Sequence, residues 1–307
     1  MWYQTIVRLK QQNPKISVGH LCGLFGKTRQ AYYEVDKYKK RRSVEEVYVL
    51  EMVAIIRREQ PKIGTVKLYR IMQDFFDEHQ IKMGRDALHS LLSIHGLIIK
   101  RKRRYVITTY SKHWLRKYDN LIKDITLTSA EQLWVSDITY IALVDGFNYL
   151  SLVTDGYSRK IVGYCLHETL ESDGCIKALK MALETRITNN KLIHHSDRGI
   201  QYCSAAYVKI LNKHNIAISM TEKGSPYENA IAERINGILK YELGLEAVFD
   251  NREDAVFSVT KAIYIYNSKR PHMSCDMQTP NQAHAKTGIL KKHWKNNNEK
   301  LRNTIIN

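Results

Sequence analysis

The stretch PYENAIAERINGILK, residues 226–240, has the apolar spacing of an amphipathic helix. Asn229, Glu233, Gly237 and Lys240 recur every three or four residues, so they share one face of that helix. That face combines an amide, a carboxylate, a bare backbone and an ammonium group, and apolar residues flank it. We therefore expect the helix to pack on a core while this polar face binds something anionic and metal-bridged.

Two further carboxylates lie upstream in segments that resemble strands. Asp137 is part of LWVSDITYIAL, a β-branched and aromatic run, and Asp197 follows the short apolar run in KLIHHSDRGIQY, just before a glycine turn. Asp197 lies 60 positions after Asp137, and 35 residues separate it from Glu233. A strand acid, a strand-end acid and a helix acid in this order and spacing form a specific pattern.

These motifs identify a family. The segments WVSDITYI, HHSDRGIQY, SPYENAIAERINGILK and YNSKRPH…TP resemble the second-frame transposase of the insertion-sequence-three family, over roughly residues 15–285. The resemblance implies a catalytic core like that of retroviral integrases, on a ribonuclease-H-like fold. It also implies that Asp137, Asp197 and Glu233 are the catalytic acids. A lone acid is usually a cap or a surface residue, but three acids inside these motifs favour catalysis.

Phosphoryl transfer at a DNA phosphodiester requires charge neutralisation and an activated attacking oxygen, which two divalent ions can supply. An all-oxygen site suits Mg²⁺ or Mn²⁺, so we expect two such ions. Asp137 would bridge both ions, Asp197 would hold one, and Glu233 would hold the other.

Other residues of the motifs are candidate DNA contacts. Lys240 resembles the basic residue of the family that contacts terminal DNA, although a solvated helix lysine is the alternative. Asn229 would position a water molecule or a phosphate. Arg270 and His272 match the closing motif of the family and are expected to reach the scissile phosphate or the flanking DNA.

The charge of the chain is strongly asymmetric. The 307 residues carry a formal net charge of +17. Residues 1–118 hold 25 Lys and Arg against 10 Asp and Glu, a net of +15, and the remainder has a net of +2. A polyanion, most commonly nucleic acid, is the expected partner of the basic third, and a merely soluble basic surface is the alternative.

The cysteines and the hydropathy exclude other classes of protein. Five cysteines without a C-x-x-C pair fit a reducing cytosol rather than a disulfide framework, and they leave no zinc module like that of retroviral integrases. No run approaches eighteen apolar residues, so no membrane span is expected. We therefore expect a cytoplasmic, nucleoid-associated protein.

The pattern predicts an α/β core preceded by all-α units. Residues 16–35 have the pattern of a helix-turn-helix in which Thr28 caps the second helix, and Arg29 and Gln30 near its start suit base edges or phosphates. KYKKRR at 37–42 is predicted to be a basic linker, and Ser43 with Glu46 to cap a new helix. The expected domains are a helix-turn-helix-like segment at 1–42, a second such DNA-binding domain at 43–99, a basic linker at 100–131, an integrase-like core at 132–285 and a polar tail at 286–307.

The linker at 100–131 begins with five consecutive cations, which are predicted to bind the DNA backbone: Lys100, Arg101, Lys102, Arg103 and Arg104. Within the core we expect three antiparallel strands followed by the order α-β-α-β-α. This is the order of a ribonuclease-H-like fold, a mixed five-stranded sheet flanked by helices.

The leading interpretation is a DNA transposase that binds the terminal inverted repeats of its element. It would expose a 3′-OH by cleavage, and that hydroxyl would then attack a second phosphodiester. The resemblance implies a circular intermediate made by joining the two ends, followed by integration into target DNA. Both steps need two ends held together, so at least a homodimer is expected, and a first-frame protein is a possible further partner. The alternatives are a catalytically idle, transposase-derived repressor and a ribonuclease-H-like nuclease that cuts without joining.

Overall fold

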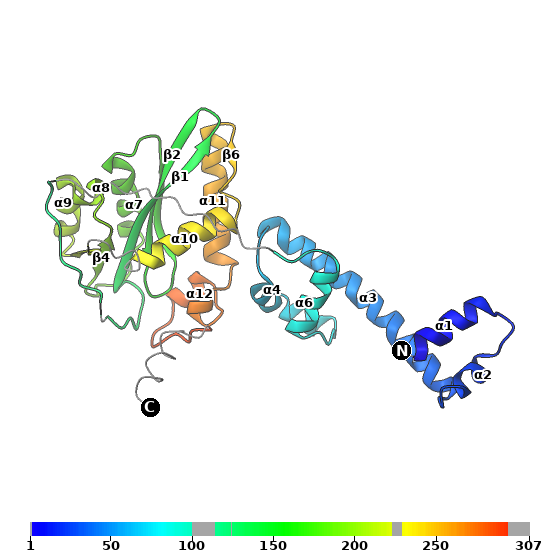
Figure 1. The fold of residues 1–307 in the computed structure, drawn as a ribbon. Helices are drawn as coiled ribbons and strands as arrows, with labels where there is room; N and C mark the ends of the chain where they lie inside the picture. Colours follow the sequence, from blue (N-terminus) through cyan, green and yellow to red (C-terminus); the bar gives the residue numbers. More distant parts are fainter. Residues whose placement is uncertain (1, 100–113, 124, 223–228, 294–307) are drawn as a thin grey trace, which may run out of the picture.

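The computed structural model describes residues 2–99, 114–123, 125–222 and 229–293, and it consists of two helical units followed by an α/β core (Figure 1). The helices of the N-terminal units are α1 (Trp2–Gln12), α2 (Val18–Gly23), α3 (Arg29–Glu59), α4 (Thr65–Ile71), α5 (Gln73–Glu78) and α6 (Arg85–Ile94). No helix in this described part of the chain is both long and apolar enough to span a membrane.

The core is built on a mixed sheet. Its strands are β1 (Leu133–Leu143), β2 (Gly146–Asp155), β3 (Ile161–His167), β4 (Ile193–Ser196), β5 (Ala217–Met220) and β6 (Val248–Phe249). The order β3-β2-β1-β4-β5 has antiparallel pairs among β1, β2 and β3 and parallel pairs from β1 through β4 to β5. The predicted ribonuclease-H-like fold class is confirmed. The short strand β6, which pairs with the far end of β1, adds a sixth strand to the five expected.

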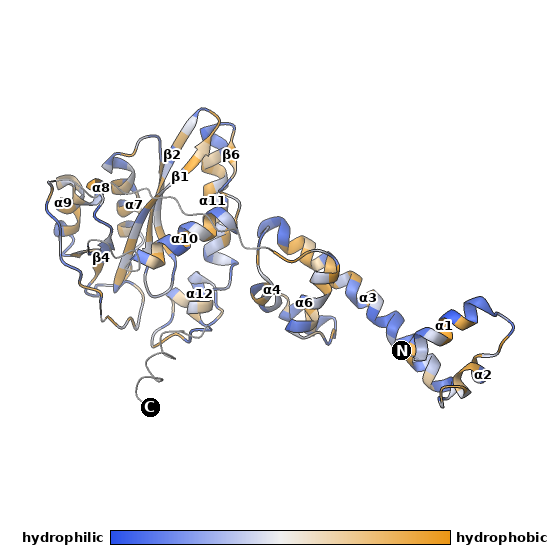
Figure 2. Ribbon diagram, in the orientation of Figure 1, coloured by the Kyte–Doolittle hydropathy of each residue, from blue (hydrophilic) through white to orange (hydrophobic). Residues whose placement is uncertain are grey.

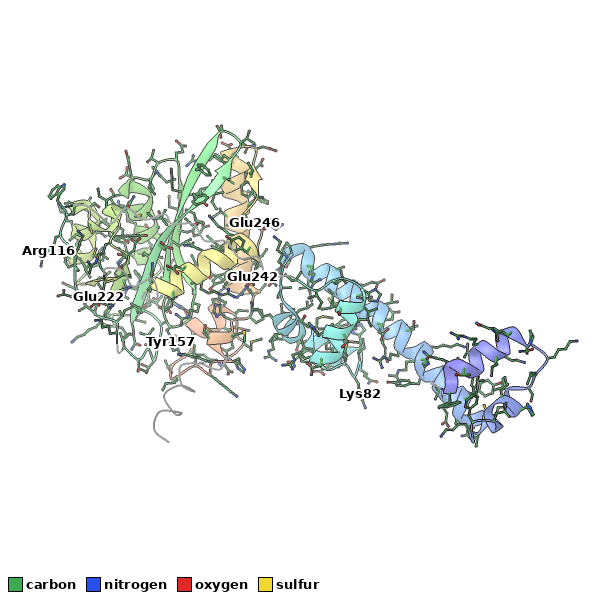
Figure 3. All side chains as sticks on the ribbon, in the orientation of Figure 1. Lys82, Arg116, Tyr157, Glu222, Glu242 and Glu246 are labelled. Carbon is green, nitrogen blue, oxygen red and sulfur yellow. The ribbon has the colours of Figure 1, made fainter. Side chains whose placement is uncertain are left out.

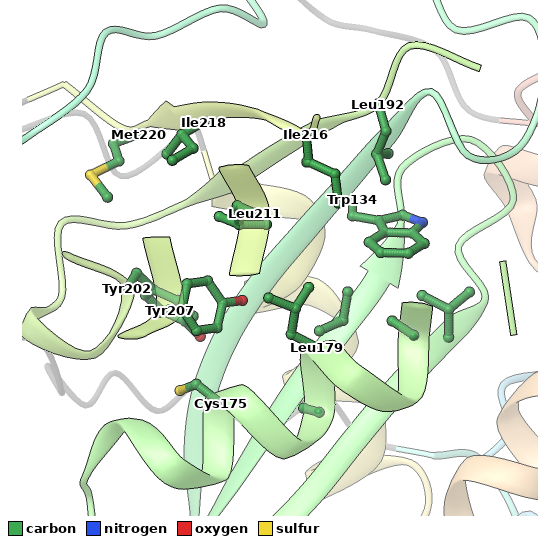
Figure 4. Packing of buried hydrophobic residues seen from close by; sticks show 14 of the residues in the cluster. Trp134, Cys175, Leu179, Leu192, Tyr202, Tyr207, Leu211, Ile216, Ile218 and Met220 are labelled. Atoms are coloured by element: carbon green, nitrogen blue, oxygen red, sulfur yellow. The ribbon is translucent and has the colours of Figure 1, made fainter. Parts of the chain in front are cut away.

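Helices cover both faces of this sheet. They are α7 (Ser172–Glu184), α8 (Ile200–Cys203), α9 (Ala205–Lys213), α10 (Ala230–Tyr241), α11 (Arg252–Ser268), the 3-10 turn η2 (Met273–Cys275) and α12 (Pro280–His284). One apolar cluster joins α7 and α9 to the sheet around the fully buried Trp134 (Figure 4). A second cluster joins α10 and α11 to the opposite face around Ile141 and Leu152. The sheet is thus buried on both sides, as expected for its parallel part.

The first helical unit has a small core. Ile6, Leu21 and Cys22 are buried between α1, α2 and the start of α3. The hydroxyl of Thr28 accepts a hydrogen bond from the backbone N–H of Ala31 at 3.1 Å, so the predicted cap of the second helix is confirmed.

The expected linker at 37–42 is wrong, because α3 continues through it as one helix of 31 residues. Lysine and arginine are good helix formers, and acids four residues away offset their charges. The ion pairs are Lys40–Asp36 at 2.9 Å, Arg41–Glu45 at 2.8 Å and Arg42–Glu46 at 3.1 Å. Ser43 and Glu46 therefore lie inside a helix and do not begin one. Figure 2 shows this hydrophilic part of α3 between the two units.

The second unit consists of the C-terminal half of α3 with α4, α5 and α6. Its core is formed by Val49, Val53, Ile63, Leu68, Met72, Phe76, Ile81, Leu88, Leu91 and Leu92. Gly96 ends α6 with a φ of +67°, a left-handed conformation that glycine adopts at little cost. This unit lies against the core at the side where α10 ends (Figure 1).

Candidate active site

Asp137 lies in the middle of β1, which is flanked by β2 on one side and β4 on the other. Its carboxylate Oδ2 accepts a hydrogen bond from the side-chain Nδ2 of Asn236 on α10, at 2.7 Å. Burial and the nearby charge of Asp197 raise the pKa of Asp137 to about 7, while the N–H of Ile138 and the amide of Asn236 act in the opposite direction. Its surroundings therefore disfavour the charged form of this carboxyl group unless a cation is present.

Asp197 follows the last residue of β4, and the pairing of Ser136 with Ser196 brings it beside Asp137. Its Oδ1 accepts a hydrogen bond from the N–H of Gly199 at 2.9 Å. A Cβ added at Gly199 would lie 2.9 Å from that same oxygen, so the turn has no room for a side chain.

Both aspartates line one cavity of about 250 Å³ beside the inner strands β1 and β2. The other lining residues are Ile138, Thr139, Tyr140, Tyr149, Leu170, Gly199, Ile200, Gln201 and Tyr202. The walls are therefore largely aromatic and aliphatic, with the two carboxylates as the charged groups. A half-buried pair of like charges in such a setting favours a cation between them.

Glu233 projects from the first turn of α10, which packs on β1. Its side chain is exposed, and partial burial still raises the pKa of its carboxyl group. Its charge contributes to the raised pKa of Asp137, but Glu233 does not line the cavity. Among the described residues, no three His, Cys, Asp or Glu side chains are close enough together to hold one metal ion. The two aspartates therefore line the same cavity, whereas Glu233 lies outside its lining.

Asn229 and Lys240, from the same predicted helix face, have different surroundings. Asn229 is buried at the start of α10, and its Nδ2 donates to the backbone carbonyl of Ser136 at 3.4 Å, so it fastens the helix to β1. The Nζ of Lys240 lies 3.7 Å from the ring centroid of Tyr140. Burial lowers the pKa of Lys240, and the charge of Asp137 acts against that shift.

Arg270 and His272, which were expected to reach DNA, both have partners within the fold. Arg270 is 2% exposed, and its guanidinium donates to Oε2 of Glu242 at 2.7 and 3.0 Å. The Nδ1 of His272 lies 2.7 Å from the hydroxyl of Ser274, at the start of η2. Burial, followed by the charge of Arg270, holds the pKa of His272 well below its usual value. Both side chains act inside the fold in this structure.

Arg29 and Gln30 are exposed at the start of α3, as a role at base edges or phosphates would require. Gln30 donates to Glu34 within the same helix at 3.1 Å. The five cations predicted to bind the DNA backbone, Lys100 to Arg104, lie outside the described residues.

Asn236 and Gly199 donate hydrogen bonds to the two aspartates, and the sequence pattern did not single them out as site residues. Asn236 lies three positions after Glu233, so helical spacing alone places it one turn further along α10, on the side facing Asp137. Gly199 lies two positions after Asp197, in the expected glycine turn. A glycine in such a turn is a signal that the backbone approaches another group closely, and here that group is the carboxylate of Asp197.

Comparison with known proteins gives a consistent result. Two models described as integrase core domain match residues 128–226 and 214–280. The chain is 36% identical over 82% of its length to the uncharacterized 31 kDa protein of insertion element IS600 from Shigella sonnei, of which it covers 93%. It is 28% identical over 90% of its length to transposase InsF for insertion sequence IS3A from Escherichia coli K12, covering 96% of that protein.

Among solved structures, the catalytic core domain of HTLV-2 integrase in complex with magnesium matches 51% of the chain. The chain covers 97% of that structure, with 19% identity and a TM-score of 0.41. On the relatives and the matched core, the chain belongs to the IS3 family of insertion-sequence transposases, which are polynucleotidyl transferases of the integrase type.

Proposed function

We propose that this transposase cleaves the 3′ ends of its element and joins them to target DNA, with Asp137, Asp197 and Glu233 as its catalytic acids. The observation that carries the proposal is the meeting of Asp137 and Asp197 in one cavity, under the helix that bears Glu233. The donor groups of Asn236 and Gly199 hold one oxygen of each aspartate, which orients the remaining oxygens.

The residues fit a divalent cation. Burial and the charge of Asp197 raise the pKa of Asp137, so the two carboxylates form a hard, all-oxygen site in which a cation would relieve their repulsion. We propose two ions, Mg²⁺ or Mn²⁺, with Glu233 as the further ligand. When bound, they would supply charge neutralisation at the phosphate and lower the pKa of an attacking oxygen. The aromatic and aliphatic walls of the cavity would exclude bulk water from that charge.

The basic N-terminal third would bind the terminal inverted repeats. Residues 1–118 have a net charge of +15 from 25 basic and 10 acidic residues, and Arg29 and Gln30 are exposed at the start of α3. We propose that at least two copies act together when bound to two ends, with a first-frame protein as a possible further partner.

The test is strand transfer with purified protein, labelled element ends and Mg²⁺ or Mn²⁺. Asp197→Asn keeps the size of the side chain and removes its charge, so joined products are expected for the wild type and not for this variant. Asp145→Asn, at an exposed turn between β1 and β2, is the matched control and is expected to join as well as wild type.

Two outcomes would contradict the proposal. Cleavage without joining, with or without a first-frame partner, would indicate a nuclease. Binding of the ends without either reaction would indicate a repressor, and Asp137, Asp197 and Glu233 would then have no catalytic role.

A further inference from the structure

A second cavity lies between the second helical unit and the core, and no comparison assigns it a role. We call it the seam cavity; it has a volume of about 480 Å³. Its lining residues are Arg70, Ile71, Asp74, Lys269, Pro271, Met277, Gln278, Thr279, Gln282 and Lys286. The first three belong to α4 and α5, and the others to the segment from the end of α11 past α12.

Ion pairs join the two units beside this cavity. Lys67 on α4 pairs with Glu242 at 3.2 Å, and Lys62 pairs with Glu246. The carboxylate of Glu59 pairs with Lys269 at 2.7 Å. Figure 3 shows Glu242 and Glu246 on the side of the core that faces the helical unit. The cavity therefore lies between two units that are linked by ion pairs.

The lining is basic and rich in hydrogen-bonding groups. It contains three cations and one acid, Asp74. Glu59 offsets the charge of Lys269, so Arg70 on one wall and Lys286 on the other supply the positive potential. The side chains of Gln278 and Gln282 also line the cavity, and their amide NH2 groups are hydrogen-bond donors.

We propose that the seam cavity binds a backbone phosphate of DNA where the duplex passes from the helical unit to the core. Two cations on opposite walls with side-chain amides between them match a phosphate group, which accepts several hydrogen bonds at once. The site rests on the proposed function, since it requires DNA to span both units. It would set the register of the duplex without reading its sequence.

The lining contains both cations and an acid, so removing a cation and removing the acid should change the affinity for DNA in opposite directions. Loss of one phosphate contact weakens binding uniformly across sequences and lowers the magnitude of the salt slope by about 1. Arg70→Gln and Lys286→Gln should each do so, on element ends and on an unrelated duplex alike. Asp74→Asn removes the one acid of the lining and should tighten binding of both duplexes.

The experiment measures fluorescence anisotropy of the full chain with both duplexes over a range of salt. Lys180→Gln, an exposed lysine on α7 across the sheet from α10 and α11, is the matched control and is expected to keep the wild-type slope. A parallel strand-transfer assay tests the proposed function separately. If the Arg70→Gln and Lys286→Gln variants have lowered salt slopes but the wild type joins no ends, the phosphate site is supported and the transposase reaction is refuted.

Inorganic phosphate distinguishes a DNA contact from a site for a small anion. Calorimetric titration of the wild type with inorganic phosphate is expected to show no saturable binding, because one ion lacks the rest of the duplex. Saturable binding that Lys286→Gln abolishes, together with unchanged DNA slopes, would overturn the proposal. Slopes unchanged in Arg70→Gln, Lys286→Gln and Asp74→Asn would overturn it as well.

Discussion

Asn236 donates to Asp137 across 99 positions of sequence, and this hydrogen bond opposes the rise in the pKa of that carboxyl group. Asn236→Ala should raise the pKa of Asp137 further, so the carboxylate form would appear only at higher pH. We expect strand transfer at neutral pH to fall by roughly tenfold and the acid limb of its pH profile to move to higher pH. The profile is measured at a fixed metal concentration.

Asn212→Ala, an exposed asparagine on α9, is the control for this change. A variant at Asn236 that loses activity equally at all pH values would show that the amide does not act through the protonation of Asp137.

Gly199 permits close approach to Asp197. Its φ of −62° suits any residue, but an added Cβ would lie 2.9 Å from Oδ1 of Asp197 and 3.1 Å from Oε1 of Gln201. Gly199→Ala should therefore displace the carboxylate and lower strand transfer by about ten- to a hundredfold, while the melting temperature stays near that of the wild type. Gly84→Ala, where an added Cβ meets nothing within 4 Å, should leave both quantities unchanged. Full activity of Gly199→Ala would refute this role.

At the scale of elements, the glycine at position 237 lowers the stability of helix α10. Gly237 lies inside the helix, and an added Cβ there meets nothing within 4 Å. Because glycine loses more conformational entropy in a helix than alanine, Gly237→Ala should raise the free energy of unfolding by about 0.5–1 kcal/mol. Thermal or urea unfolding measures it. Ala232→Gly, in the same helix, should act in the opposite direction, and a loss of stability in Gly237→Ala would contradict the argument.

The elements of the core were predictable because their patterns are local. The β-branched run around Asp137 and the apolar spacing around Glu233 each indicate one conformation, and β1 and α10 have it. The chain from 37 to 42 was not predictable in this way. A run of cations suits both a linker and a helix, and the helix forms because acids four residues away pair with it.

The site was predictable only in part. Asp137 and Asp197 meet because parallel strands β1 and β4 are neighbours, which their spacing in the family motif anticipates. The partners of Asp137 and Arg270 were not predictable, since Asn236 and Glu242 reach them through packing between distant segments. Arg270 in particular shares its motif with DNA contacts, but burial gives it an internal role.

At the scale of the whole molecule, one partly buried carboxylate joins the second helical unit to the core. Glu242 at the end of α10 accepts from Arg270 and pairs with Lys67 of α4, whose position is 175 residues away. Burial raises the pKa of Glu242, but Arg270 and Lys67 outweigh it and hold that pKa below its usual value. Glu242→Gln would leave Arg270 buried without an anion, and it should destabilise the protein by about 3–5 kcal/mol.

Lys67 contributes to this cluster in a way that depends on pH. Burial, followed by the charge of Arg270, lowers the pKa of Lys67 from 10.5 to about 8, despite the attraction of Glu242. Below pH 8 the lysine is charged in both the folded and the unfolded chain, so the folded state carries the full cost of its burial. Between pH 8 and 10.5 the unfolded chain binds more protons, and this cost disappears as the pH rises.

Lys67→Met keeps the length of the side chain and removes the charge. We expect it to raise the free energy of unfolding by about 1 kcal/mol at pH 7, because Arg270 still neutralises Glu242. This advantage over the wild type should shrink as the pH rises from 8 towards 10.5. Chemical unfolding of both proteins across that pH range measures the difference in their free energies of unfolding. Groups that titrate in both proteins contribute equally and cancel from this difference. A variant that is less stable at pH 7 would show that the Lys67–Glu242 pair holds the helical unit on the core.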